Sequence, residues 1–462
     1  MNNIKINSIK HISILCIFLS LTAYLIQEKV DGPVTARSVD IYLNIMKFKH
    51  SEYSHSLVST NRSYYHITGY QVQNRIFFPL FLKGADLIVT SILGQGEGYE
   101  KMSMRAKDLR MKFLRAFYSM IYLFSIFAMY LLVFIFLKKY INNDDSIVYT
   151  GLLFFICSVL IFIAPPKMHK VEDQLQVILF IAVLIYIIEN RYISLCFITV
   201  LTSMTRESSL FIWIIYLVVE TFRLFFTTKK KFLKPEKKLL GINSVIYKVF
   251  FYKVVPRCAL LLFLALFSIL GIRAIFFGGF PYSLGIGMEG GSVGFIWPGE
   301  ISELNFGPNV HPVISMLSRF IRTVFIPDSS ITWFLITSML FISIFQPNRP
   351  KLILRIVATI IILSTIFSFF HYWIVIYIWA LMNIICLFLL CCSIYLNKRD
   401  FLDKSLIIAS VVIFFITAIF TNFQEARSFY VSFTLLLIPI AKSIENCKNT
   451  RVQTMQPIIN DL

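Results

Sequence analysis

The chain has 462 residues, of which 57% are hydrophobic and 15% are charged, and its formal net charge is +19. Soluble domains are typically about 45–50% apolar and about 25% charged, so this composition excludes an ordinary soluble globule. The densest basic run, 229–238, lies between two apolar segments and has no nucleic-acid-binding motif beside it. We therefore predict a membrane protein and expect no nucleic-acid partner.

Apolar segments long enough to cross about 30 Å of hydrocarbon recur along the whole chain. They predict an all-α, polytopic bundle of about twelve spans that forms a single transmembrane domain over 1–462. The predicted spans are 11–26, 116–137, 147–164, 174–189, 192–205, 208–226, 258–277, 330–346, 353–370, 374–396, 405–421 and 428–446.

The basic residues predict how these spans are oriented. If the N-terminus lies in the cytoplasm, the short loops on that side, the long 227–257 loop and the C-terminal tail are all basic. This is the charge bias expected of cytoplasmic segments. We therefore expect both termini in the cytoplasm, and we expect a loop over 27–115 and a Gly-rich loop over 278–329 on the outer side.

Two segments of the first outer loop have helical periodicity and are predicted to lie on the membrane surface. In 76–93, Lys83, Asp86 and Thr90 recur at helical spacing and form a polar stripe. If 76–93 crossed the bilayer, every later basic loop would face outward, so the interfacial placement is preferred. The second interfacial helix is predicted over 37–48.

In this topology the charged residues at helix ends gather on the outer face. Charges at membrane depth are costly to desolvate, so they usually pair or serve a site. Carboxylates can act as a base and cations can hold a phosphate, which suits group transfer from a lipid phosphate carrier. Capping, snorkelling and salt bridges are the structural alternatives. The candidates are Asp40, Arg75, Lys167, His169, Lys170, Glu172, Asp173, Arg206, Glu207, Arg319, Arg322, His371, Glu425 and Arg427.

Several of these candidates form short motifs in a fixed order. The motifs are Asp40-x-Tyr42, Arg75-x-x-x-Pro79, Glu172-Asp173-Gln174, Arg206-Glu207-Ser208 and Glu425-x-Arg427. Their order and their places between spans resemble GT-C-type glycosyltransferases, which use polyprenyl-phosphate sugars. The resemblance covers most of 1–226 and about the last forty residues. The middle of the chain has no match to this pattern, and the first loop has no D-x-D motif, so we assign no metal and no cofactor.

The resemblance implies roles for the matched residues. Asp40 would be the general base that takes a proton from the acceptor hydroxyl. Asp173 or Glu172 would orient the acceptor or the sugar. Cations would stabilise the lipid phosphate as it leaves. The substrate- and phosphate-binding set is Arg75, Lys167, His169, Lys170, Arg206, Glu207, Glu425 and Arg427.

The sequence thus predicts a multi-pass glycosyltransferase of a bacterial inner membrane. It would move a sugar from a polyprenyl-phosphate donor to a surface glycan or lipid-linked acceptor on the periplasmic side. Three alternatives stay open. The first is an O-antigen polymerase that works through the 278–329 loop with Arg319 and Arg322. The second is a transporter or lipid flippase, and the third is a structural membrane protein.

Overall fold

The computed structural model describes residues 6–31, 77–94, 102–158, 170–205, 207–232, 246–277, 400–420 and 430–460. These residues contain helices and no strand, which agrees with the predicted all-α class. The helices are α1 (Ile6–Asp31), α5 (Phe77–Leu93), α6 (Met104–Tyr140), α7 (Asp144–Ser158), α8 (Lys170–Ile188), α9 (Tyr192–Thr205), η2 (Glu207–Phe211), α10 (Ile212–Phe232), the π-helix η3 (Phe250–Val254), α12 (Val255–Phe277), α19 (Phe401–Phe420) and α20 (Tyr430–Asn460).

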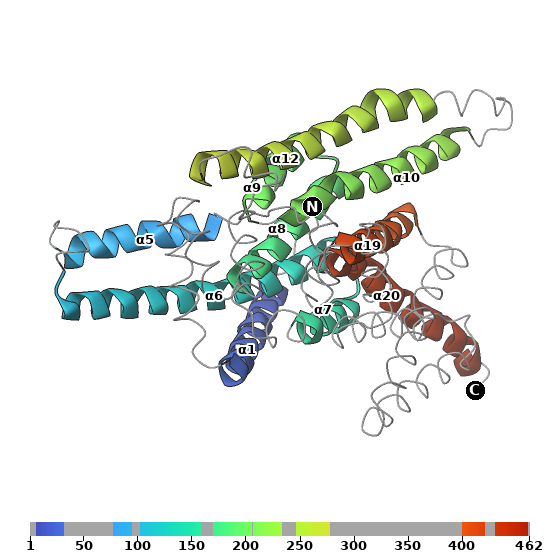
Figure 1. Cartoon of the computed structure of the whole chain (residues 1–462). Helices are drawn as coiled ribbons and strands as arrows, with labels where there is room; N and C mark the ends of the chain where they lie inside the picture. Colours follow the sequence, from blue (N-terminus) through green and yellow to red (C-terminus); the bar gives the residue numbers. More distant parts are fainter. Residues whose placement is uncertain are drawn as a thin grey trace, which may run out of the picture.

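A helix lies at each predicted span that falls within these residues (Figure 1). Three helical stretches are long and apolar enough to cross a membrane: Met104–Tyr140, Ser209–Thr227 and Ile246–Ile269. The protein is therefore all-helical over the described residues, with three candidate membrane-spanning helices. The total of about twelve spans stays a prediction. The predicted spans between 330 and 396, the interfacial helix 37–48 and the Gly-rich loop lie outside the described residues.

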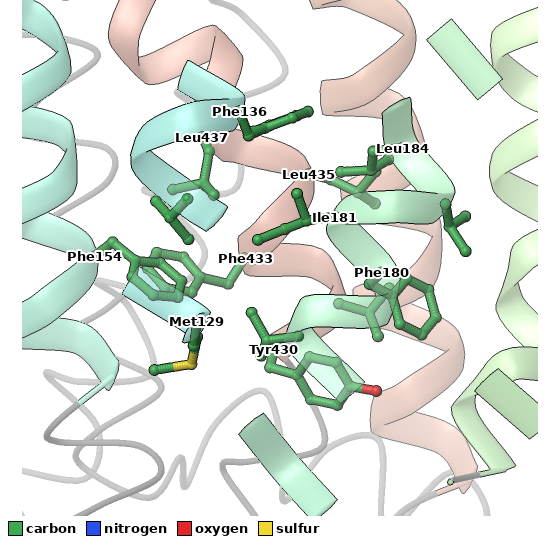
Figure 2. Close-up of a cluster of buried hydrophobic side chains, with 14 of the residues drawn as sticks. Met129, Phe136, Phe154, Phe180, Ile181, Leu184, Tyr430, Phe433, Leu435 and Leu437 are labelled. Carbon is green, nitrogen blue, oxygen red and sulfur yellow. The ribbon is translucent and has the colours of Figure 1, made fainter. Parts of the chain in front are cut away.

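The core of the bundle lies where α6, α7, α8 and α20 meet. Large apolar side chains fill it, and Figure 2 shows that they come from helices far apart in the sequence. The rings of Phe154 and Phe433 stack with centroids 5.2 Å apart, which joins α7 to α20. The ring of Phe180 meets that of Tyr430 edge-on at 5.9 Å, which joins α8 to α20. Such aromatic contacts add about 0.5–1.5 kcal/mol each beyond the area they bury.

One end of the bundle is held by paired charges. Lys139 forms an ion pair with Glu189, which ties the end of α6 to the end of α8. Arg223 donates hydrogen bonds to the carbonyl oxygens of the last two residues of α8, at 2.9 and 3.0 Å. Lys442 on α20 lies 2.6 Å from Asp400, which precedes α19. An aromatic contact joins the last turns of α10 to the first residue of α19, so these interactions share one region. We call it the paired-charge end.

The helix α5 packs antiparallel to the first half of α6, and the two form a hairpin (Figure 1). Phe81 near the start of α5 stacks on Phe117 of α6, and Asp86 later in α5 contacts Arg110 earlier in α6. The predicted periodicity of the polar stripe is confirmed. The stripe, however, faces α6: Asp86 is only 2% exposed because Arg110 and Lys83 bind its carboxylate.

The helix α6 is longer than the span predicted within it. It begins at Met104, where the Ser103 hydroxyl caps it by accepting a hydrogen bond from the backbone N–H of Ala106 (3.2 Å). Hydropathy sets the predicted start at residue 116 because the first turns of the helix are charged. Those residues are nonetheless good helix formers. At 37 residues the helix is about 55 Å long, more than the hydrocarbon thickness of about 30 Å.

Candidate functional site at the amide end of the bundle

Asp173 is buried in the first turn of α8, at the end of that helix opposite the paired-charge end. It is 1% exposed. A carboxylate in the first turn of a helix is stabilised by the helix dipole and by backbone N–H groups that have no partner within the helix. The start of α8 is therefore a place where a membrane protein can keep an acid with little access to water.

Gln174, the next residue, bonds to α6. The Ser125 hydroxyl lies 2.7 Å from the carbonyl oxygen of Tyr122 and also contacts the amide oxygen of Gln174. A hydroxyl has one proton and cannot donate to both oxygens. If the amide of Gln174 is turned by half a rotation, its nitrogen donates to Ser125 while Ser125 donates to Tyr122. This arrangement gives the Ser125 proton a single acceptor and gives the Gln174 nitrogen a partner, so we assign the amide that way.

Gln176 makes the same kind of contact with α9. The Thr205 hydroxyl lies 2.7 Å from the carbonyl oxygen of Thr202 and also contacts the amide oxygen of Gln176. Because residues two apart on a helix point in different directions, α8 is joined to α6 by Gln174 and to α9 by Gln176. We call the region of Ser125, Asp173, Gln174, Gln176 and Thr205 the amide end.

One atom of the Gln174 amide has no hydrogen-bond partner within the described part of the chain. The side chain is 0% exposed, so water does not replace that partner at its surface. Leaving a buried polar group without a hydrogen bond costs about 1–3 kcal/mol. With the amide turned as assigned, the atom without a partner is the oxygen, which can accept a hydrogen bond from a donor such as a hydroxyl.

Other motif-bearing segments enter or leave the described helices near this end. Tyr24, close to the end of α1, lies 6.1 Å from Tyr122, ring centroid to ring centroid. Thr205 ends α9 and Glu207 begins η2. Tyr430, the first residue of α20, contacts Phe180 on α8 (Figure 2). The segments that carry Asp40, Arg206–Glu207 and Glu425–Arg427 are therefore continuous in sequence with helix ends in this region.

Of the predicted site residues, the structure describes the side chain of Asp173 alone. Lys170 and Glu172 lie in the first turn of α8 and Glu207 starts η2, with side chains outside the described part. The remaining candidates lie wholly outside the described residues, and the convergence of their side chains stays a prediction. They are Asp40, Arg75, Lys167, His169, Arg206, Arg319, Arg322, His371, Glu425 and Arg427.

Three polar residues of this region were not singled out by the sequence: Ser125, Gln176 and Thr205. Each lies within an apolar predicted span and carries no charge, so neither motif order nor charge clustering marks it. The available signal was the presence of polar side chains in spans that otherwise carry almost none. Such residues form hydrogen bonds between membrane helices.

Chemically, the amide end offers a carboxylate together with neutral amide and hydroxyl groups. Such groups suit recognition of hydroxyl-bearing molecules such as sugars, because each can donate or accept a hydrogen bond. Among the described residues no cluster of three His, Cys, Asp or Glu is placed to hold a metal ion. Comparisons with protein-family models, curated proteins and solved structures found no match.

Proposed function

We propose that the protein is an integral membrane glycosyltransferase. It moves a sugar from a polyprenyl-phosphate donor to a surface glycan or lipid-linked acceptor on the periplasmic side of a bacterial inner membrane. The observation that carries the proposal is the burial of Asp173 at an end of the bundle where α9 also ends and α20 begins. The motifs 206–207 and 425–427 adjoin those same helix ends in sequence, which supports a shared site.

In the proposed reaction Asp40 accepts the proton of the acceptor hydroxyl, and the hydroxyl oxygen attacks the anomeric carbon of the sugar. The bond from that carbon to the phosphate oxygen breaks, and the lipid phosphate leaves as an anion. Arg206 and Arg427 stabilise the charge that develops on it. Asp173 holds the acceptor or the sugar in place, and the amides of Gln174 and Gln176 orient α8.

The test compares three variants in membranes supplied with a radiolabelled polyprenyl-phosphate hexose and the acceptors of those membranes. Asp40→Asn is expected to lower transfer about 10²–10⁴-fold, because it removes the base. Asp173→Asn is expected to lower it about 10²-fold, because a misplaced substrate loses reactive geometry. Asp144→Asn is the control, since this side chain is 72% exposed at the paired-charge end, and it should leave transfer unchanged.

Full transfer activity in both Asp40→Asn and Asp173→Asn would refute the proposal. Uptake of a solute by proteoliposomes that contain no donor lipid would identify a transporter instead. The polymerase alternative depends on Arg319 and Arg322, which lie outside the described residues, so the structure adds no support to it.

A further inference from the structure

The helix α5 turns its polar side chains inward and its apolar side chains outward. Asp86 is 2% exposed against α6, whereas Leu87, Ile88 and Ile92 are 59%, 64% and 70% exposed. An ordinary surface helix has the opposite polarity, with charges toward water. The outward positions of α5 carry no charge. They are Phe81, Gly84, Leu87, Ile88, Ser91 and Ile92.

This outward face continues onto α6 without a polar break. The ring of Phe81 stacks on Phe117 at 5.8 Å, and Phe117 stacks on Phe113 at 6.2 Å. From Phe113 an exposed apolar stripe follows α6 at helical spacing into its apolar second half, which forms part of a candidate membrane span. The stripe consists of Leu109, Phe113, Met120 and Phe124.

A second stripe on the first half of α6 is exposed and charged. Its members are three or four residues apart, and the turn of about 100° per residue places the stripe about 110° around the helix from the apolar one. The members are Arg105, Asp108, Lys112 and Arg115. Asp108 pairs with Lys112 at 2.7 Å, and Arg105 and Arg115 give the stripe a net positive charge. An apolar face flanked by a basic face is the pattern of helices that lie at the boundary of headgroups and acyl chains.

We propose that the α5–α6 hairpin is a lipid-facing arm. The outward face of α5 and the apolar stripe of α6 lie against acyl chains of the bilayer, and the charged stripe lies at the level of the lipid phosphates. The partner is lipid because the apolar stripe leads directly into a helix apolar enough to cross the membrane. The buried contact of Asp86 with Arg110 lets α5 enter this environment, because the carboxylate of Asp86 is bound by α6 and is not exposed to hydrocarbon.

The experiment compares two positions that are about equally exposed in the structure. Ile88 is 64% exposed on the outward face of α5, and the Asp108 side chain is 61% exposed on the charged stripe. Ile88→Cys and Asp108→Cys are each made in the full chain with its eight native cysteines replaced. A nitroxide is attached, and the proteins are placed in liposomes of phosphatidylethanolamine and phosphatidylglycerol. Collisions with oxygen, which partitions into acyl chains, are then compared with collisions with a water-soluble nickel chelate.

The proposal expects oxygen collisions to exceed nickel collisions at position 88, and the reverse order at position 108. Ile92→Cys, at 70% exposure on the same face of α5, repeats the measurement where the first variant does not fold. Nickel collisions in excess at both 88 and 92 would show that water covers the face and would overturn the proposal. Spin–spin coupling between labels at position 88 of two molecules would overturn it as well, because a second copy would then occupy the face.

Discussion

Replacing Arg110 by methionine is expected to release α5 from α6. Arg110 donates a hydrogen bond from Nε to Asp86 at 2.6 Å and also contacts the hydroxyl of Thr90 at 3.2 Å. The Arg110 and Asp86 side chains are 5% and 3% exposed. Without the guanidinium, the carboxylate keeps Lys83 at 3.0 Å and loses its most buried partner.

The size of the effect follows from this burial. Removing one member of a buried ion pair costs about 3–5 kcal/mol where the other charge is left uncompensated. Because Lys83 still compensates Asp86 in part, we expect Arg110→Met to cost about 3 kcal/mol, the lower end of that range. The double variant Asp86→Leu/Arg110→Met should lose much less, since replacing a whole buried pair by apolar side chains is often close to neutral. Lys112→Met is the matched control on the same helix. Its ion pair with Asp108 is 69% and 61% exposed, so its loss should cost less than about 1 kcal/mol.

Hydrogen exchange of the α5 backbone amides measures this free energy locally, because these amides exchange when α5 opens from α6. At 1.4 kcal/mol for each factor of ten, a loss of about 3 kcal/mol corresponds to exchange about 10²-fold faster in Arg110→Met. The double variant and Lys112→Met should stay within about tenfold of the original chain. If Arg110→Met and Lys112→Met accelerate exchange equally, the ion pair does not hold the hairpin and the reasoning from burial is wrong.

Two further predictions concern the rest of the bundle. A Cβ atom at Gly151 on α7 would overlap the ring of Phe134, which is 1% exposed, so Gly151→Ala should lower the free energy of unfolding by about 1–3 kcal/mol. Gly84→Ala is the control and should not destabilise the chain, because a Cβ there meets no atom within 4 Å. Denaturant titration of both variants measures the difference. For Asp400, partial burial raises the pKa, but hydrogen bonds from Lys442 and from the Asp403 backbone more than offset this and leave the pKa below its usual value. A carboxylate with a lowered pKa stabilises the fold above its ordinary pKa of about 3.9 and loses that contribution as the pH falls through the lowered value. Acid should therefore weaken the α19–α20 contact in the original chain more than in Asp400→Asn. Unfolding of both chains at pH 7 and below pH 4 measures this difference.

The sequence predicts the positions of the described helices well, because long apolar segments leave few alternatives. It is less accurate at helix ends. At α6, the Ser103 cap and a charged first turn extend the helix beyond its apolar part. Periodicity also identifies the stripe of Lys83, Asp86 and Thr90. It does not identify the partner of the stripe, because Arg110 lies on another helix and periodicity describes one helix at a time.

The same holds for the candidate site, where the sequence identifies residues within one motif but not their contacts with other helices. Asp173 is predicted because it belongs to a charged motif, and the structure shows it buried in the first turn of α8, while its role in a site stays a prediction. Ser125 and Thr205 were not found, because a lone hydroxyl in an apolar span usually bonds to its own backbone, as both also do here. What distinguishes them is a second contact with a glutamine of α8, and that contact depends on how three helices pack.

The polar groups at the two ends of the bundle are satisfied by different interactions: ion pairs at one end and neutral hydrogen bonds at the other. At the paired-charge end the acids and cations meet directly, as Lys139 and Glu189 do, so these charges are already compensated within the protein. At the amide end the hydrogen bonds between helices join neutral side chains, and a neutral network does not compensate a charged ligand in advance. An arriving lipid phosphate could not displace a paired cation without leaving its acid uncompensated. We therefore propose that the phosphate chemistry takes place at the amide end, where Arg206 and Arg427 adjoin the helix ends in sequence and Asp173 lies in the first turn of α8.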